Sequence, residues 1–358
     1  MGSVKDLEVI EKPTADKMGV GKFHFSDRYS VFDWGEMPDH IDGKGAALCL
    51  MGAYCFEWLE AKGVKTHYRG LVDKNGQVVT FEELTAPTST MEVNIVNVYK
   101  PATRDVKGKV VYDYSRYTPN LKNCLIPLEI IYRNGLPEGS SVFKRLAQGK
   151  ITVKDLGLDH NPYLGERFTQ PIFDVSTKLE EADRYVTWDE AKKIAGLTTP
   201  EVADVKAVLS KVDDAISRIS SHAGLENEDG KIELAFNSDR RLMVVDVVGT
   251  LDECRFTYGG VHVSKEVARQ FYKKTVWYSD VEEAKKTAET QGVKDWKALC
   301  KSQCFFNLPL AVYSKLIRIV QNNHSLTSFD CFFDMLTRCH ALISSCSNRK
   351  YHSSCLPL

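Results

Sequence analysis

Residues 229–255, DGKIELAFNSDRRLMVVDVVGTLDECR, constrain the fold more than any other stretch of the chain. Alternating polar and apolar residues are followed by a polar turn and then by a second apolar run, which is the pattern of two antiparallel strands joined by a short loop. If residues 238–241 form the turn, counting back along both strands places Glu233 directly opposite Asp246. The sequence therefore predicts a hairpin with two facing carboxylates.

Two like charges at such a position destabilise a sheet unless a cation lies between them. Magnesium binds one or two carboxylates together with phosphate oxygens, so the pair predicts a site for a metal-bound nucleotide. Period two also places Lys231 on the same face as Glu233. An alternative interpretation is a solvated sheet face on which Lys231 and Arg241 serve as counter-charges.

A second informative stretch is 126–145, IPLEIIYRNGLPEGSSVFKR. Glu129 and Arg133 share one face of a predicted strand, and a Gly-Ser-Ser segment precedes two basic residues. Guanidinium groups, hydroxyls and loop amides suit a phosphate monoester. Ser140 could equally be the N-cap of an ordinary helix, in which case no ligand is needed to explain the serines.

The order of predicted elements indicates a chain of two or three domains, as expected for 358 residues. We predict an opening hairpin at 7–12 and 21–26, strands at 92–99 and 127–133, and helices at 46–62, from Thr199 to near Gly224, and across 264–291. The predicted boundaries are 1–123 for a β lobe with one helix, 124–302 for a larger α+β lobe, and 303–358 for an atypical tail that contains half of the cysteines.

Bulk properties exclude several classes of protein. A net charge of -1 provides no broad positive field for nucleic acid, and no apolar run is long enough to suggest a membrane segment or an export signal. We therefore expect a cytoplasmic protein whose ten cysteines are buried or free thiols. The sequence does not fix the oligomeric state, and a homo-oligomer is possible.

Six motifs in order resemble those of the SAICAR synthetase family. They are SDRYSVFD, GKG before a helix, PLEIIYRN with GSSVFKR, PIFDVSTK, GKIELAF and DVVGTLDECRF, and the match as a whole spans roughly residues 19–277. The resemblance implies an α+β fold with two lobes on antiparallel sheets and an ATP cleft between them. It also implies ATP-dependent condensation of L-aspartate with carboxyaminoimidazole ribotide to give the succinocarboxamide SAICAR, ADP and phosphate, with magnesium, in purine biosynthesis.

The matching positions imply a role for each site residue. Lys231 and Lys178 would be catalytic, and a lysine of the opening hairpin would meet phosphate; of Lys12, Lys17 and Lys22 we expect Lys22. The full expected sets are Lys22, Glu129, Lys231 and Asp246 for ATP; Asp229, Glu233 and Asp246 for the metal; and Asp33, Lys44, Gly45, Arg133, Ser140, Lys178, Asp183 and Arg255 for the substrates.

The chain departs from the family pattern at several positions. Val247, Leu251 and Cys254 stand where Glu, Pro and Ser are common in the family, and the usual closing helix is not recognisable after residue 303. These departures leave two alternatives open: a nucleotide-binding protein without catalysis, or a kinase or ligase of the same scaffold that acts on another phosphorylated acid.

Overall fold

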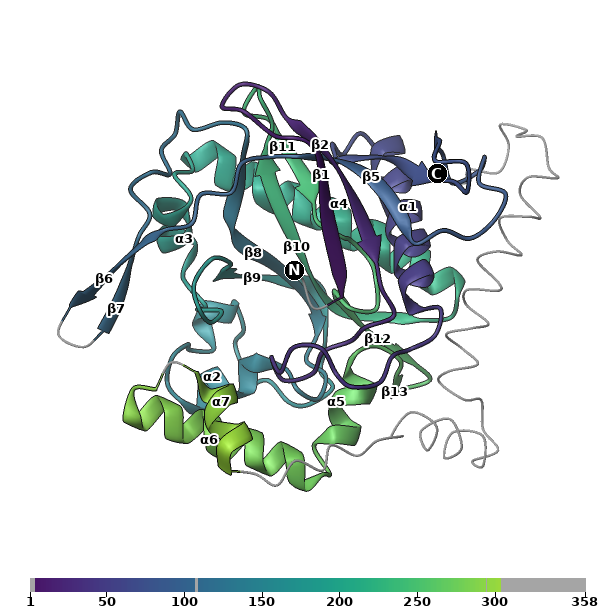
Figure 1. The fold of residues 1–358 in the computed structure, drawn as a ribbon. Coiled ribbons are helices and arrows are strands. Elements are labelled where there is room, and N and C mark those ends of the chain that lie inside the picture. The colour runs from purple at the N-terminus through teal and green to yellow at the C-terminus, as the bar shows by residue number, and fades with distance from the viewer. Residues whose placement is uncertain (1–3, 107–108, 294, 304–358) are drawn as a thin grey trace, which may run out of the picture.

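Two antiparallel sheets form the framework of the chain (Figure 1). The computed structural model describes residues 4–106, 109–293 and 295–303. The first sheet has the order β1-β2-β5-β3-β4, from β1 (Lys5–Glu11), β2 (Gly19–Phe25), β3 (Tyr68–Val72), β4 (Val78–Val79) and β5 (Thr90–Ile95). The predicted opening hairpin is confirmed, because β1 and β2 pair antiparallel with Leu7 opposite Phe23.

The second sheet has the order β13-β12-β10-β8-β9, and β11 pairs with the far end of β10. Its strands are β8 (Cys124–Gly135), β9 (Arg167–Thr177), β10 (Glu226–Phe236), β11 (Leu242–Val245), β12 (Cys254–Tyr258) and β13 (Val261–His262). Strands β8 and β10 lie at its centre and are buried over almost their whole length. A separate hairpin of β6 (Ala102–Val106) and β7 (Lys109–Asp113) projects from the body (Figure 1).

The helices are α1 (Lys44–Ala61), α2 (Ser141–Ala147), α3 (Trp188–Ile194), α4 (Thr199–His222), α5 (Glu266–Tyr272), α6 (Val276–Gln291) and α7 (Trp296–Gln303), with a short 3-10 turn at Lys154–Leu156. The predicted start of α4 at Thr199 is confirmed, and the preceding residue, Thr198, is the N-cap and forms a reciprocal capping box with Glu201. The single helix predicted across 264–291 is wrong. Helix α5 ends at Tyr272, residues 273–275 are not helical, and Thr275 is the N-cap of α6.

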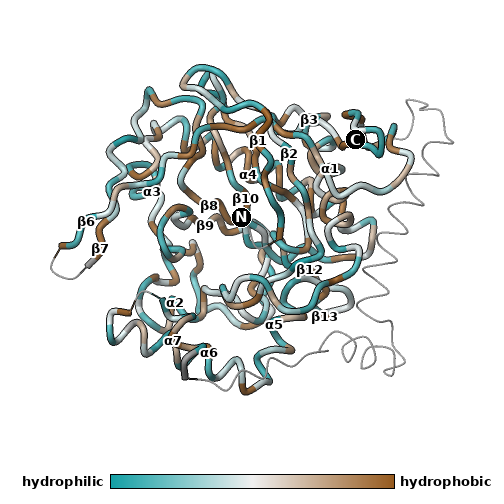
Figure 2. The backbone as a smooth tube through the Cα atoms, viewed as in Figure 1, coloured by the Kyte–Doolittle hydropathy of each residue, from teal (hydrophilic) through white to brown (hydrophobic). Residues whose placement is uncertain are grey.

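One apolar core runs through both sheets. It contains side chains of β2 and β5, of α1 and α4, and of β8 and β10; α1 packs on the first sheet, α4 packs on the second, and the two helices contact each other. The hydrophobic positions gather along these central strands and helices (Figure 2). Burial of this shared core ties the two sheets together.

A second core lies apart from the first. In it, Tyr29, Trp34 and Met37 from the loop before α1 pack against Tyr272 and Trp277 of the C-terminal helices. This packing places a loop from the first part of the chain on helices from the last part.

Backbone bridges also join the two sheets, at Thr66 with Val244 and at Asn97 with Cys124. The first sheet is built entirely from residues 5–95 and the second from residues 124–262. We keep the division near residue 123 as a proposal, since it falls between the two sheets while the core crosses it.

In the described part of the chain no helix is long and apolar enough to cross a membrane. The described cysteines, Cys49, Cys55, Cys124, Cys254 and Cys300, are all buried, which agrees with the prediction of buried or free thiols for these five. The other five belong to the tail, and the prediction of an atypical tail at 303–358 falls almost wholly outside the described residues.

Candidate active site

Glutamates and lysines alternate on one face of β8, β9 and β10. Register places Glu129 of β8 directly opposite Glu233 of β10. Lys178, just after β9, bridges them, with its Nζ 2.5 Å from an oxygen of Glu233 and 3.3 Å from one of Glu129. Lys231 Nζ lies 2.8 Å from Glu129 and 3.7 Å from Glu253. The expected facing carboxylates are present, but the partner directly across from Glu233 is Glu129.

The predicted pairing of Glu233 with Asp246 is wrong by one residue. Glu233 lies opposite Val245, because the loop contains five residues instead of four and Phe236 pairs with Leu242. Asp246 follows the strand in the left-handed region, with φ 65°. That conformation is uncommon for a residue other than glycine and is typical of functional sites when the surroundings enforce it.

Two groups from the first part of the chain, Lys5 and His67, hold Asp246. Lys5 of β1 extends its Nζ to 2.8 Å from the carboxylate. The imidazole of His67 is buried, with Nε2 3.0 Å from the Asp246 carbonyl oxygen and Nδ1 3.2 Å from the Asn94 carbonyl oxygen. Burial lowers the pKa of His67 to about 4, so the ring is neutral and has one N–H to donate.

Burial and charge shift the carboxylates in opposite directions. Burial and, secondly, the Asp246 charge raise the pKa of Glu233 to about 7. Burial would raise the pKa of Asp246 as well, but Lys5 and Lys178 outweigh it and the pKa falls below its ordinary value. Burial would lower the pKa of Lys178, yet Glu233 and Glu129 raise it above its usual range. The lysines therefore stay charged beside an anionic Asp246.

An apolar cluster adjoins these charged groups. It contains Leu125, Ala235, Met243 and Val245, with Met18, Val96 and Leu179 packed around it. Ala235 lies two residues beyond Glu233, and Val245 immediately precedes Asp246. A flat apolar group could therefore bind next to the carboxylates.

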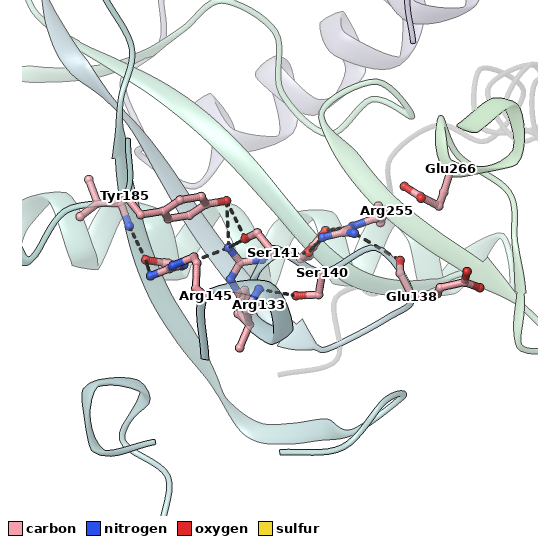
Figure 3. A network of polar contacts seen from close by, with 12 residues as sticks. Arg133, Glu138, Ser140, Ser141, Arg145, Tyr185, Arg255 and Glu266 are labelled. Atoms are coloured by element: carbon pink, nitrogen blue, oxygen red, sulfur yellow. Dashed lines mark hydrogen bonds and ion pairs between the residues drawn. The ribbon is translucent and has the colours of Figure 1, made fainter. Parts of the chain in front are cut away.

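A second polar network, of arginines and aspartates, lies further along the same strands (Figure 3). Arg133 of β8 pairs with Asp174 of β9 at 3.1 Å and with Asp229 of β10 at 3.4 Å. Arg145 of α2 is 2.5 Å from Asp174, and Arg255 of β12 donates from Nε to Asp229 at 2.8 Å. We call these five side chains the arginine cluster; all are buried, and their three guanidiniums exceed their two carboxylates.

The arginine cluster retains unused donors. The Nε atoms of Arg133 and Arg145 have no hydrogen-bond partner in the described structure. Buried donors without partners are costly, so the cluster suits an anionic ligand that brings further oxygens.

The sequence left open whether Ser140 caps a helix or contacts a ligand, and the structure separates these two roles between Ser140 and Ser141. Ser140 is the N-cap of α2 and accepts from the Val142 amide at 3.5 Å, as the alternative interpretation proposed. Ser141 instead contacts Arg133 NH2 at 3.4 Å. The hydroxyl that lies against the cluster is therefore the neighbour of the predicted one.

The three predicted metal carboxylates do not form one group. Asp229 belongs to the arginine cluster, four residues along β10 from Glu233, which is about 13 Å in a strand. Within the described residues no set of three or more His, Cys, Asp or Glu side chains could hold a metal. Glu233 and Asp246 remain a fitting pair, since oxygen ligands from one or two carboxylates are what magnesium takes beside phosphate.

The predicted motif precedes α1 as expected, but the protein's own side chains already bind its amides and its lysine. Asp27 accepts from the amides of Gly43 at 3.1 Å and Gly45 at 2.8 Å, so its carboxylate fills the helix N-terminus. A Cβ at residue 45 would lie 2.7 Å from the Phe25 carbonyl oxygen, which explains the glycine. Lys44 pairs with Asp252 at 2.7 Å.

The remaining predicted residues are more exposed. The Asp33 side chain is 89% exposed and pairs with Lys285 at 3.3 Å. Asp183 is exposed, within electrostatic range of Glu129, Lys231 and Asp33. Lys22 is half-buried on β2, opposite Glu8.

Sequence reasoning missed several side chains of both networks, namely Lys5, His67, Asp174, Tyr185, Asp252 and Glu253. The only sequence signal for Lys5 is its position at the start of an alternating strand, KDLEVIE. The family motif pointed instead to Lys12, Lys17 and Lys22. Asp174 lies inside the recognised motif PIFDVSTK but was not singled out.

Comparisons with known proteins agree with this architecture. The family model described as SAICAR synthetase matches residues 12–291. A protein of Archaeoglobus fulgidus assigned provisionally as a phosphoribosylaminoimidazole-succinocarboxamide synthase is 51% identical over 285 residues, covering 80% of this chain and 83% of that protein. The phosphoribosylaminoimidazole-succinocarboxamide synthase of Thermoplasma volcanium is 36% identical over 265 residues, covering 72% and 79%.

Solved structures share the fold. A SAICAR synthetase (Type-2) in complex with ADP superimposes with a TM-score of 0.52 at 19% identity, over 75% of this chain and 88% of that one. The Type-1 crystal structure of SAICAR synthetase from Pyrococcus horikoshii gives a TM-score of 0.52 at 20% identity, over 76% and 91%. These superpositions confirm the expected α+β fold with antiparallel sheets.

Proposed function

This chain belongs to the SAICAR synthetase family, and from that premise we propose that it is the ATP-dependent ligase that joins L-aspartate to carboxyaminoimidazole ribotide in purine biosynthesis. The observation that carries the proposal is the family match over residues 12–291, which includes every residue of the two polar networks except Lys5. Family membership favours neither alternative, the protein without catalysis or the enzyme for another phosphorylated acid.

The alternation of lysines and carboxylates supports a site for metal-bound ATP. Lys5, Lys178 and Lys231 currently neutralise Glu129, Glu233, Asp246 and Glu253, three cations for four carboxylates. A metal-phosphate ligand carries both positive and negative charge. Its cation can therefore bind the carboxylates while its phosphate groups bind the lysines. Each released charge thereby gains a new partner.

Glu233 and Asp246 would hold magnesium, which would neutralise charge on the phosphates during transfer. The adenine base would lie on the apolar cluster at Leu125, Ala235, Met243 and Val245, with Glu129 near the ribose. Among the hairpin lysines, the structure favours adding Lys5 to the expected Lys22, because Lys5 already reaches Asp246.

The arginine cluster supports recognition of the ribotide phosphate. Its excess positive charge and the two unpartnered Nε atoms suit a phosphate monoester, which Arg133, Arg255 and the serines at the start of α2 would contact. Buried guanidiniums already ordered by aspartates lose little conformational freedom on binding.

The reaction follows in two steps. A carboxylate oxygen of the ribotide attacks the γ-phosphorus of ATP, and the bond to ADP breaks, which gives an acyl phosphate. The amine of L-aspartate then attacks the acyl carbon, phosphate leaves with the bonding electrons, and the amine releases a proton. Lys231 and Lys178 would stabilise negative charge on the transferring phosphoryl group, and Asp183 with Lys178 would orient the amino acid.

The proposal is tested by ADP release from purified protein with ATP, magnesium and carboxyaminoimidazole ribotide, with and without L-aspartate, and by the product mass. We expect ADP release that depends on aspartate and the mass of the succinocarboxamide. Nucleotide binding by folded protein without turnover would support the non-catalytic alternative, and turnover with a different acid would support the other.

Two further expectations stay proposals. Five buried cysteines among the described residues suit the reducing cytoplasm, which we propose as the location of the protein. A homo-oligomer is possible and is tested by sedimentation or light scattering.

A further inference from the structure

Tyr185 connects the arginine cluster to the loop that carries Lys178 and Asp183 (Figure 3). Its hydroxyl oxygen accepts from Ser141 Oγ at 2.9 Å and from Arg133 NH2 at 3.4 Å. Its ring faces the guanidinium of Arg145, 3.9 Å from the ring centroid. Three groups that surround the proposed phosphate site therefore contact one tyrosine.

The hydroxyl of Tyr185 can still donate one hydrogen bond to an anion. A phenol can accept twice and donate once, and both contacts to the oxygen are accepted bonds. The O–H is therefore available to donate to a further oxygen on the side of the cluster. A phosphate oxygen is a strong acceptor for such a donor.

The loop before Tyr185 is closed at its base, so a movement of Tyr185 is transmitted to it. The Thr177 amide donates to the Arg184 carbonyl oxygen at 2.9 Å, and Ser176 forms an isolated bridge with Tyr185. Arg184 in turn binds Glu180 inside the loop, with NH2 to Oε1 at 2.9 Å. Residues 178–184 thus form a closed loop whose exit is anchored on the arginine cluster.

We propose that Tyr185 is a substrate-binding residue: its hydroxyl donates to a phosphate oxygen of the phosphorylated substrate and thereby fixes the 178–184 loop, on which the amino acid is proposed to bind. This inference rests on the proposed function of the arginine cluster as the phosphate site. Tyr185 would then contact the phosphorylated substrate and, through the loop, position Lys178 for the second substrate.

The test uses the full chain and Tyr185→Phe, which keeps the ring on Arg145 and removes only the hydroxyl. A hydrogen bond to a charged group predicts that the KM for carboxyaminoimidazole ribotide rises between about tenfold and a hundredfold. The KM for ATP should change less than about twofold. Tyr163→Phe is the matched control, because Tyr163 is an exposed loop tyrosine.

Hydrogen exchange gives a second readout that a merely structural role would not move. With saturating magnesium-ADP present, ribose 5-phosphate should slow amide exchange across 178–186 in the wild type and in Tyr163→Phe, but not in Tyr185→Phe. Equal KM values and equal protection in Tyr185→Phe and wild type would overturn the role of Tyr185. Failure of the wild type to bind ribose 5-phosphate or the ribotide would instead overturn the phosphate site itself.

Discussion

A buried carboxylate that has no cationic partner among the residues that the structure describes gives the sharpest prediction about stability. Asp213 of α4 packs on the sheet face opposite the active site, where its Oδ1 accepts from Asn134 Nδ2 at 2.7 Å and from Asn227 Nδ2 at 3.1 Å. The residue is 4% exposed. Burial raises its pKa to about 6, only partly offset by the hydrogen bonds from Asn134 and Ser217. We predict that Asp213→Asn stabilises the protein at neutral pH.

The sign and size follow from the two pKa values. The folded pKa, about 6, lies above the unfolded value near 3.8, so the native state binds the proton more tightly. The stability that this proton contributes is complete below about pH 4 and is lost as the pH rises through about 6. About two pH units at roughly 1.36 kcal/mol each correspond to about 3 kcal/mol at pH 7.5. Asn keeps the accepting oxygen and avoids this loss.

The assay is denaturant or thermal unfolding of both proteins at pH 4.5, 6 and 7.5. The free energy of unfolding of Asp213→Asn relative to wild type should grow from about 1 kcal/mol at pH 4.5 to about 3 kcal/mol at pH 7.5, where the gain corresponds to roughly 5 °C in Tm. The exposed neighbour Asp214→Asn is the control and should show no such pH-dependent gain. A gain that is the same at all three pH values, or a loss at pH 7.5, would refute the burial argument.

Three further predictions concern the active site. Glu233→Gln and Asp246→Asn should each abolish aspartate-dependent ADP release while leaving Tm within a few degrees of wild type; near-normal turnover in either would remove it from the metal site. His67→Gln, whose amide reaches the position of Nε2 and can donate to the Asp246 carbonyl oxygen, should keep more magnesium-dependent nucleotide affinity than His67→Leu, and equal affinities would show that the histidine only fills space. Binding of ADP should weaken when EDTA removes magnesium in wild type, and an unchanged Kd would contradict a metal bridge.

The hairpin at 229–255 shows how far periodicity reaches. Alternation correctly placed Lys231 and Glu233 on one face of a strand. The register failed by one residue because Asn237 joins the loop, where its Oδ1 accepts from the amides of Asp239 and Arg241 at 2.9 Å each. A side chain that caps a turn in this way shifts every pair beyond it, and hydrophobic periodicity contains no signal for such a bond.

The sequence also did not predict which charged side chains pair with each other. Motifs identified Arg133, Arg255 and Asp229 as site residues, but a strand pattern does not state which carboxylate meets which guanidinium. The structure places Asp229 between the two arginines, so a residue assigned to the metal from its motif is held instead by cations. Lys5 was missed for the same reason, since its contact with Asp246 depends on how the first sheet packs on the hairpin.

The spacing of the two networks follows from the strands themselves. Glu129 and Arg133 lie four residues apart on β8, as do Glu233 and Asp229 on β10, so the lysine-carboxylate site and the arginine cluster are about 13 Å apart along the sheet. We propose that this framework suits a substrate with a phosphate at one end and a reactive carboxylate at the other. Lys231 lies midway between Asp229 and Glu233 on the same face, which makes it the cation best placed to meet that carboxylate where the phosphoryl group arrives.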